Sequence, residues 1–148
     1  MVAETGILAG QIARQLSSGT VTAIDKSVSM IKMASRRNKP FIETGKAHFI
    51  ISDFLKSELN EAAFDKIFGF NVNIFWKDAT RELELIKLYL KPKGHLYIFY
   101  QAPYDIDIKA AKPITENLQS NSFQVIDTIF KKMSPASAFC IVSRPIIK

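Results

Sequence analysis

The stretch TVTAIDKSVSMIKMASRR, residues 20–37, decides the fold class of this chain. Its first part, residues 20–24, is short, mostly apolar and rich in β-branched side chains, which predicts a strand buried on both faces. Asp25 follows at once, and Ser27 stands where it can cap a helix over residues 28–37. A buried strand joined directly to a helix is the repeating unit of a parallel sheet.

Predicted strands and helices alternate along the rest of the chain. Further strands are expected at residues 47–51, 64–70, 95–100, 123–132 and 138–143, and further helices at residues 6–16, 79–90 and 108–119. Residues 91–94, KPKG, predict a stop and a turn. Such alternation implies right-handed crossovers on a mostly parallel sheet, so the fold class is α/β. The last two strands are spaced as a hairpin, which predicts an antiparallel strand near the C-terminal edge of the sheet.

Length and composition suit one domain over residues 1–148. With 47% hydrophobic and 23% charged residues, the composition is that of a globular protein rather than a disordered one. One cysteine, Cys140, excludes an intrachain disulfide and a multi-thiolate metal site, and no metal is expected. No apolar run reaches 18 residues, so we expect no membrane span and a cytoplasmic location.

The chain is basic, with Lys+Arg 20 against Asp+Glu 14 and a net charge of +6. Lys32, Arg36, Arg37 and Lys39 cluster, but Met33 and Ala34 interrupt them as on an amphipathic helix. We therefore expect a solvated helix face rather than a nucleic-acid surface.

Candidate ligand-binding residues follow the strands, because parallel sheets bind ligands at the carboxyl ends of their strands. Asp25, Asp53 and Asn71 stand just past three predicted strands. A carboxylate such as Asp25 can accept two ribose hydroxyl protons, or it can simply cap the following helix. Gly6, at the start of a predicted helix, allows a ligand to approach the backbone closely.

Four stretches together resemble a known family, the class I S-adenosylmethionine-dependent methyltransferases that act mostly on small molecules. Residues 23–30, AIDKSVSM, are similar to the acidic second motif, in which Asp-x-Ser-x-x-Met follows the second strand. Residues 50–54, IISDF, resemble the third motif, and residues 64–67, FDKI, resemble the start of the fourth strand. Residues 90–96, LKPKGHL, are close to the Leu-Lys-Pro-Gly-Gly-x-Leu before the fifth strand. The resemblance covers essentially the whole chain and implies a Rossmann-like fold.

The resemblance also implies a cofactor, S-adenosyl-L-methionine, with S-adenosylhomocysteine as product. Asp25 would hold the ribose hydroxyls, and Lys26 and Met30 would line the ribose and adenine pocket. Asp53 would accept a hydrogen bond from the adenine amino group, with Phe54 beside the ring.

For the reacting end, the resemblance places Asn71 near the methionine part of the cofactor. Phe75 and Trp76 become candidate contacts for a small-molecule methyl acceptor, with core packing as the other interpretation. No residue can be named as a general base, so the catalytic residues and the acceptor atom are unknown.

The first motif departs from the family pattern Gly-x-Gly-x-Gly. Only Gly6 is kept, while Val2 and Glu4 stand in place of the first two glycines, and only residues 1–3 could represent the first strand. The first strand is thus short or missing. Three explanations stay open: a fragment or upstream start, completion of the N-terminal region in a homo- or hetero-oligomer, or loss of cofactor binding.

Two other functions compete with methyl transfer. A degenerate methyltransferase fold could serve as a non-catalytic subunit or scaffold, which the altered first motif favours. A nicotinamide-dependent dehydrogenase shares the sheet and the acidic residue, but the chain lacks the Gly-x-Gly-x-x-Gly turn of that family.

Overall fold

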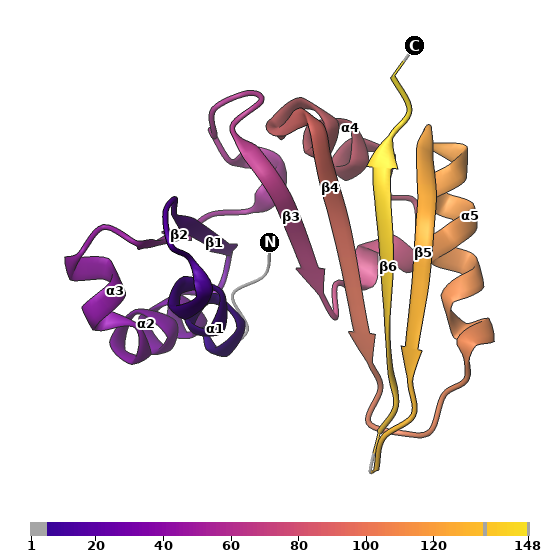
Figure 1. Cartoon of the computed structure of the whole chain (residues 1–148), viewed down its shortest axis with the longest axis horizontal. Coiled ribbons are helices and arrows are strands. Elements are labelled where there is room, and N and C mark those ends of the chain that lie inside the picture. The colour runs from indigo at the N-terminus through magenta and orange to yellow at the C-terminus, as the bar shows by residue number, and fades with distance from the viewer. Residues whose placement is uncertain (1–5, 135, 148) are drawn as a thin grey trace. The chain divides into compact units, whose positions relative to one another are not determined.

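The computed structural model describes residues 6–134 and 136–147, and the chain forms two compact units, Met1–Ser57 and Glu58–Lys148 (Figure 1). Val2, Glu4 and the proposed remnant of the first strand lie outside the described residues. In the part of the chain that is described, no helix is both long enough and apolar enough to cross a membrane.

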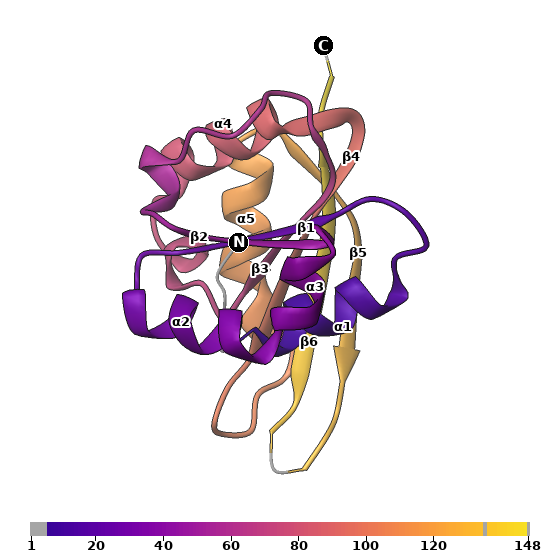
Figure 2. The ribbon, with the colours of Figure 1, turned by 90° about the vertical axis from the view of Figure 1, so that its left-hand side faces the viewer.

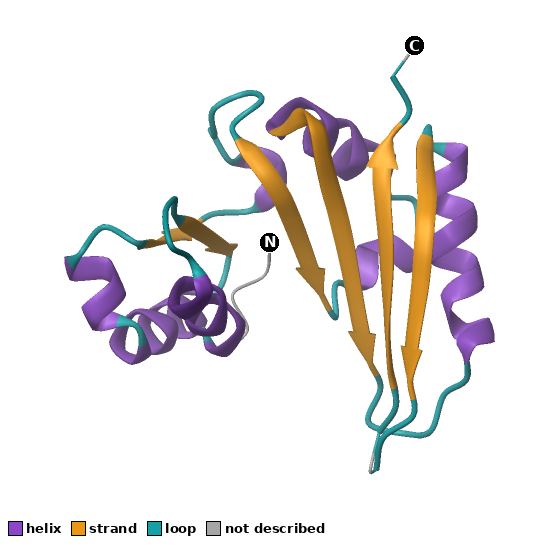
Figure 3. Cartoon of the chain, viewed as in Figure 1, coloured by secondary structure: helices purple, strands orange, loops and turns teal. Residues whose placement is uncertain are grey.

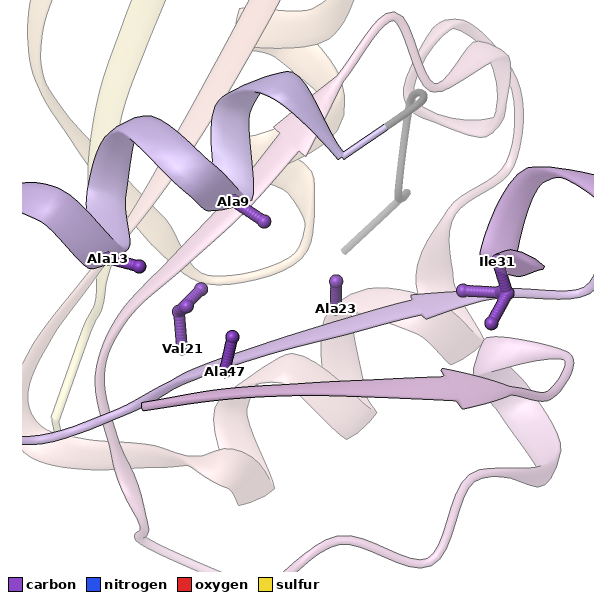
Figure 4. Close-up of a cluster of buried hydrophobic side chains, with 6 residues drawn as sticks. All are labelled: Ala9, Ala13, Val21, Ala23, Ile31 and Ala47. Atoms are coloured by element: carbon purple, nitrogen blue, oxygen red, sulfur yellow. The ribbon is translucent and has the colours of Figure 1, made fainter. Parts of the chain in front are cut away.

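The first unit is a two-stranded parallel sheet with helices packed on it. Its elements are α1 (Ile7–Gln15), β1 (Val21–Asp25), α2 (Val28–Arg37), α3 (Lys39–Glu43), β2 (Ala47–Ile51) and the 3₁₀ helix η1 (Phe54–Lys56). β1 pairs with β2 in parallel, with Val21 opposite Ala47 and Asp25 opposite Ile51. Its core consists of small and β-branched side chains from both helices and strands: Ala9, Ala13, Val21, Ala23, Ile31 and Ala47 (Figure 4).

The second unit is a four-stranded mixed sheet in the order β3-β4-β6-β5. Its elements are β3 (Phe64–Phe70), η2 (Asn73–Trp76), α4 (Thr80–Tyr89), β4 (Leu90–Gln101), η3 (Ile108–Ala111), α5 (Lys112–Ser120), β5 (Phe123–Lys131) and β6 (Ala138–Pro145). β3 and β4 are parallel, whereas β6 runs antiparallel to both of its neighbours. α4 and α5 lie on the same face of this sheet (Figures 2 and 3).

The α/β class is confirmed, with parallel pairing of β1 with β2 and of β3 with β4, and antiparallel pairing of β6 with β4 and β5. β6 is the antiparallel strand predicted near the C-terminal edge, and it lies one position in from the edge strand β5. From Gly6 onward the first strand is β1.

The turn predicted at residues 91–94 is wrong, because β4 runs through it from Leu90. Phe64 lies opposite Leu90 and Lys66 opposite His95, so the register shifts and β4 bulges between these pairs. A bulge accommodates a proline and a glycine without ending the strand.

The helix predicted at residues 108–119 begins as the 3₁₀ turn η3 and becomes α-helical at Lys112. Pro113 stands in the first turn of α5, where its missing N–H costs no hydrogen bond.

Candidate functional site

The carboxyl end of the β1–β2 sheet gathers several predicted site residues. Because the strands are parallel, Asp25 and the residues after Ile51 meet at this end, and the Ser52 N–H donates to the Asp25 carbonyl at 3.0 Å. Ala13 lies beside Val21, and Ala9 lies further along β1 toward Ala23 (Figure 4). α1 therefore runs antiparallel to β1, with its N-terminus toward the same end.

Asp25 is half-buried at the last position of β1. One carboxylate oxygen, Oδ1, accepts the Ser27 N–H at 2.9 Å, while Ser27 itself caps α2 by accepting the Met30 N–H at 3.3 Å. The predicted cap is confirmed and belongs to Ser27. Within the described residues Asp25 makes no further side-chain hydrogen bond, so its second oxygen can accept from a ligand.

The other residues predicted to hold the cofactor in this unit follow the two strands, two of them after β1 and two after β2. Lys26 is exposed, and Met30 is half-buried in the first turn of α2. Asp53 is exposed, and its Oδ1 accepts the Leu55 N–H at 3.0 Å, which starts η1. Phe54 is half-buried in the same turn. A carboxylate with an aromatic ring beside it thus follows β2.

Gly6 precedes α1 with φ +78°, a left-handed conformation that favours glycine. A Cβ there would lie 2.5 Å from Asn38 Nδ2 and 2.8 Å from the Ala34 backbone, so α2 packs directly on this residue. In the sequence, Asn38 two residues before Pro40 indicates the end of a helix and nothing more. The sequence feature that points to a packing role for Asn38 is the pair Gly6 and Gly10, which lie one helical turn apart and leave room for a side chain.

Asn71, in the second unit, joins the ends of β3 and β4. The Gln101 N–H donates to Asn71 Oδ1 at 2.8 Å, and Asn71 Nδ2 donates to the Gln101 carbonyl at 3.2 Å. Its φ of +51° is one that asparagine tolerates better than most residues. The carboxamide therefore acts as a clamp between two strands.

Phe75 and Trp76 differ in their surroundings. Phe75 is 5% exposed and packs against Gly69, where a Cβ would lie 2.9 Å from its ring. Trp76 is half-buried and makes an edge contact with Tyr100 at a centroid distance of 5.0 Å. A hydrogen bond with the exposed Tyr104 raises the pKa of Tyr100.

The remaining reactive side chains are isolated. Among residues 6–134 and 136–147, no group of three or more His, Cys, Asp or Glu residues is arranged to hold a metal ion. Cys140 lies in β6, where burial raises the pKa of its thiol to about 11. That thiol is a core side chain rather than a nucleophile.

Comparison with known proteins finds a family whose model matches this chain and a relative of low sequence identity. The model of a methyltransferase-domain family matches residues 3–94. An "uncharacterized methyltransferase YdaC" from Bacillus subtilis (strain 168) is 28% identical over 128 residues, which is 82% of this chain and 67% of that protein.

Solved structures share the fold at low sequence identity. A SAM-dependent methyltransferase from Aquifex aeolicus has a TM-score of 0.78 at 17% identity, over 95% of this chain and 77% of its own. The [4+2]-cyclase SpnF also reaches 0.78, at 14% identity, over 99% of this chain and 74% of its own. These likenesses show the Rossmann-like methyltransferase fold alone, whereas the family match covers more than half of the chain. The chain therefore belongs to the methyltransferase-domain family of class I S-adenosylmethionine-dependent methyltransferases.

Proposed function

We propose that this chain transfers a methyl group from S-adenosyl-L-methionine to a small-molecule acceptor. The observation that carries this function is the half-buried carboxylate of Asp25 at the end of β1, with one oxygen fixed and the other available to a ligand. A cytoplasmic location, expected from the sequence, is part of the same proposal.

The residues of the first unit fit the polar groups of this cofactor. A ribose offers two neighbouring hydroxyl donors, and Asp25 offers a charged acceptor that the Ser27 N–H holds in place. Adenine offers an amino donor and a flat ring, and Asp53 with Phe54 offers an acceptor and an aromatic face. Lys26 and Met30 would flank the ribose and adenine, and Gly6 would present its backbone to the methionine part.

The residues of the second unit would serve the acceptor. Trp76 is the better candidate contact because it is half-buried and keeps an aromatic edge against Tyr100, whereas Phe75 is enclosed in the core. Asn71 clamps the ends of β3 and β4 through two hydrogen bonds with Gln101, and we propose it, from the family resemblance, as a cofactor contact.

The cofactor supplies an activated methyl group on a sulfonium, and its transfer is an in-line displacement. The chain's own contribution is then to hold the two reactants in line and to exclude water from them. We assign no general base.

The test is thermal unfolding of the chain with and without S-adenosylhomocysteine. At about 100-fold excess over the dissociation constant, one site adds about 2.7 kcal/mol, which raises the midpoint by about 5–10 °C for a chain of this size. A cooperative transition that does not move would contradict the proposal and favour a non-catalytic subunit. A chain with no cooperative transition would contradict it too.

A shift establishes binding, and turnover needs a second measurement. Release of S-adenosylhomocysteine from S-adenosylmethionine would be followed with pools of small amines, phenols and carboxylic acids as acceptors. Turnover with any pool supports methyl transfer. Binding without turnover in every pool would leave the chain a cofactor-binding module and refute the catalytic part of the proposal.

A further inference from the structure

Asn38 is a buried polar residue of the first unit, 2% exposed, and its side chain links α2 to α1. It follows the last residue of α2, and its side-chain amide donates two hydrogen bonds of 2.9 Å. One goes to the Ala34 carbonyl within α2, and the other goes to the Gly6 carbonyl at the start of α1. Both amide hydrogens of Asn38 are therefore used, and one of them fixes a peptide 32 positions away.

Two glycines make room for this amide. A Cβ on Gly10 would lie 2.5 Å from Asn38 Oδ1, and a Cβ on Gly6 would lie 2.5 Å from Asn38 Nδ2. Real Cβ atoms do not approach that closely, so either side chain would displace the amide. The Gly10 N–H also donates to the Gly6 carbonyl at 3.0 Å, so this oxygen has two donors.

The link matters because the candidate cofactor residues stand on separate segments. Asp25 precedes α2 by three positions, and Gly6 precedes α1. The core contacts between α1 and β1 come from Ala9, Ala13 and Val21, and such apolar contacts are not directional. The hydrogen bond from Asn38 to Gly6 is directional, so it determines where the Gly6 peptide lies relative to α2 and Asp25.

We propose that Asn38 is a positioning residue for the cofactor. It holds the Gly6 peptide at the place, relative to Asp25, that the bound cofactor requires. Because cofactor binding at Gly6 and Asp25 is itself proposed above, this role of Asn38 rests on it.

The experiment separates positioning from packing with three variants. Asn38→Ala removes the amide, and Gly10→Ala forces a methyl group into the space that the amide occupies. In the double variant Gly10→Ala/Asn38→Ala that methyl group meets none of the atoms that it would meet in the parent, since all of them belong to the Asn38 side chain. The double variant therefore restores packing without restoring the hydrogen bond to Gly6.

Two quantities are measured for each variant: the thermal midpoint and the dissociation constant of S-adenosylhomocysteine by calorimetry. We expect Gly10→Ala to have the lowest midpoint and the double variant to regain at least that of Asn38→Ala. We expect the dissociation constant to rise at least tenfold in both variants that lack the amide, whatever their midpoints. Faster hydrogen exchange at the Gly10 amide is expected in the same two variants, because its acceptor is no longer fixed.

Wild-type affinity in the double variant would overturn the positioning role and leave Asn38 a packing residue. Loss of cooperative unfolding in both Asn38→Ala and the double variant would also overturn it, because Asn38 would then be needed for the fold itself. A wild-type chain that binds no S-adenosylhomocysteine would refute the proposed function first, and the role of Asn38 with it.

Discussion

Replacing Asp25 with asparagine removes a charge from the candidate cofactor site and leaves the local structure intact. Asparagine has the same shape, and its Oδ1 can still accept the Ser27 N–H, now 2.9 Å from the carboxylate. The α2 cap belongs to Ser27 and is not touched. We therefore expect the free energy of unfolding to change by less than about 0.5 kcal/mol, as for most substitutions that break no buried contact.

The expected loss of affinity follows from the hydrogen bonds that the carboxylate would accept. A hydrogen bond to a charged group is worth about 1.5–3 kcal/mol, against about 0.5–1.5 kcal/mol for a neutral pair. With two ribose hydroxyls on Asp25, the Asp25→Asn variant should lose about 2–3 kcal/mol of binding free energy. S-adenosylhomocysteine should then bind about 30- to 150-fold more weakly by titration calorimetry.

Asp65→Asn is the matched control. It makes the same charge change at an exposed carboxylate of the second unit, which pairs with Lys91 at 3.2 Å. Its affinity for S-adenosylhomocysteine should equal that of the wild type, which separates a local effect from the change in net charge. If the affinity of Asp25→Asn for S-adenosylhomocysteine lies within twofold of the wild type, Asp25 does not hold the ribose. The inference of a cofactor site from the position of Asp25 at the end of β1 is then refuted.

Three further predictions concern stability and reactivity. Ser27→Ala should lower the free energy of unfolding, measured in urea, by about 1 kcal/mol, because the Met30 N–H loses its acceptor at the helix start. Ser27→Thr should keep most of that stability, because threonine can also cap a helix. Equal losses in the two variants would contradict the capping role of Ser27. With a thiol pKa of about 11, Cys140 is about 0.1% thiolate at pH 8, whereas an ordinary thiol is roughly one-quarter thiolate. A disulfide reagent should therefore modify Cys140 in the native chain at least about 200-fold more slowly than in the urea-unfolded chain. Because this pKa is raised in the folded state, the unfolded chain loses the proton first, and stability should fall as pH rises from about 8.5 to 11. Similar modification rates in the native and unfolded chain would contradict the burial of Cys140.

Local signals predicted most of the secondary structure. The strands at 47–51 and 64–70 and the helix at 28–37 occur with the predicted bounds, because each is delimited by a cap or a polar residue next to an apolar run. The failure at residues 91–94 has a non-local cause. Proline and glycine predict a turn there, but pairing with β3 continues across the stretch by a register shift, which no local pattern reveals.

The position of Asp25 could be predicted because the end of a buried strand is visible in the sequence. The role of Asn38 could not, since it depends on two glycines 28 and 32 positions away that only the packing of α1 on α2 brings to it. A single asparagine before a proline indicates a helix stop, and a helix stop does occur there, at the end of α2.

The packing of α1 on α2 also limits what the presence of Gly6 indicates about cofactor binding. Gly6 is the one glycine that the chain keeps of the family's first motif, which suggests a retained binding loop. However, a Cβ at this position would meet Asn38 and Ala34 whether or not a ligand is bound, so the contact between α1 and α2 alone is enough to require glycine. Asp25 has no comparable structural reason, because Ser27 caps α2 and a neutral acceptor would serve the Ser27 N–H as well. Its charge is therefore the more specific sign of a ligand, and affinity measured on Asp25→Asn is more informative than affinity measured on any substitution of Gly6.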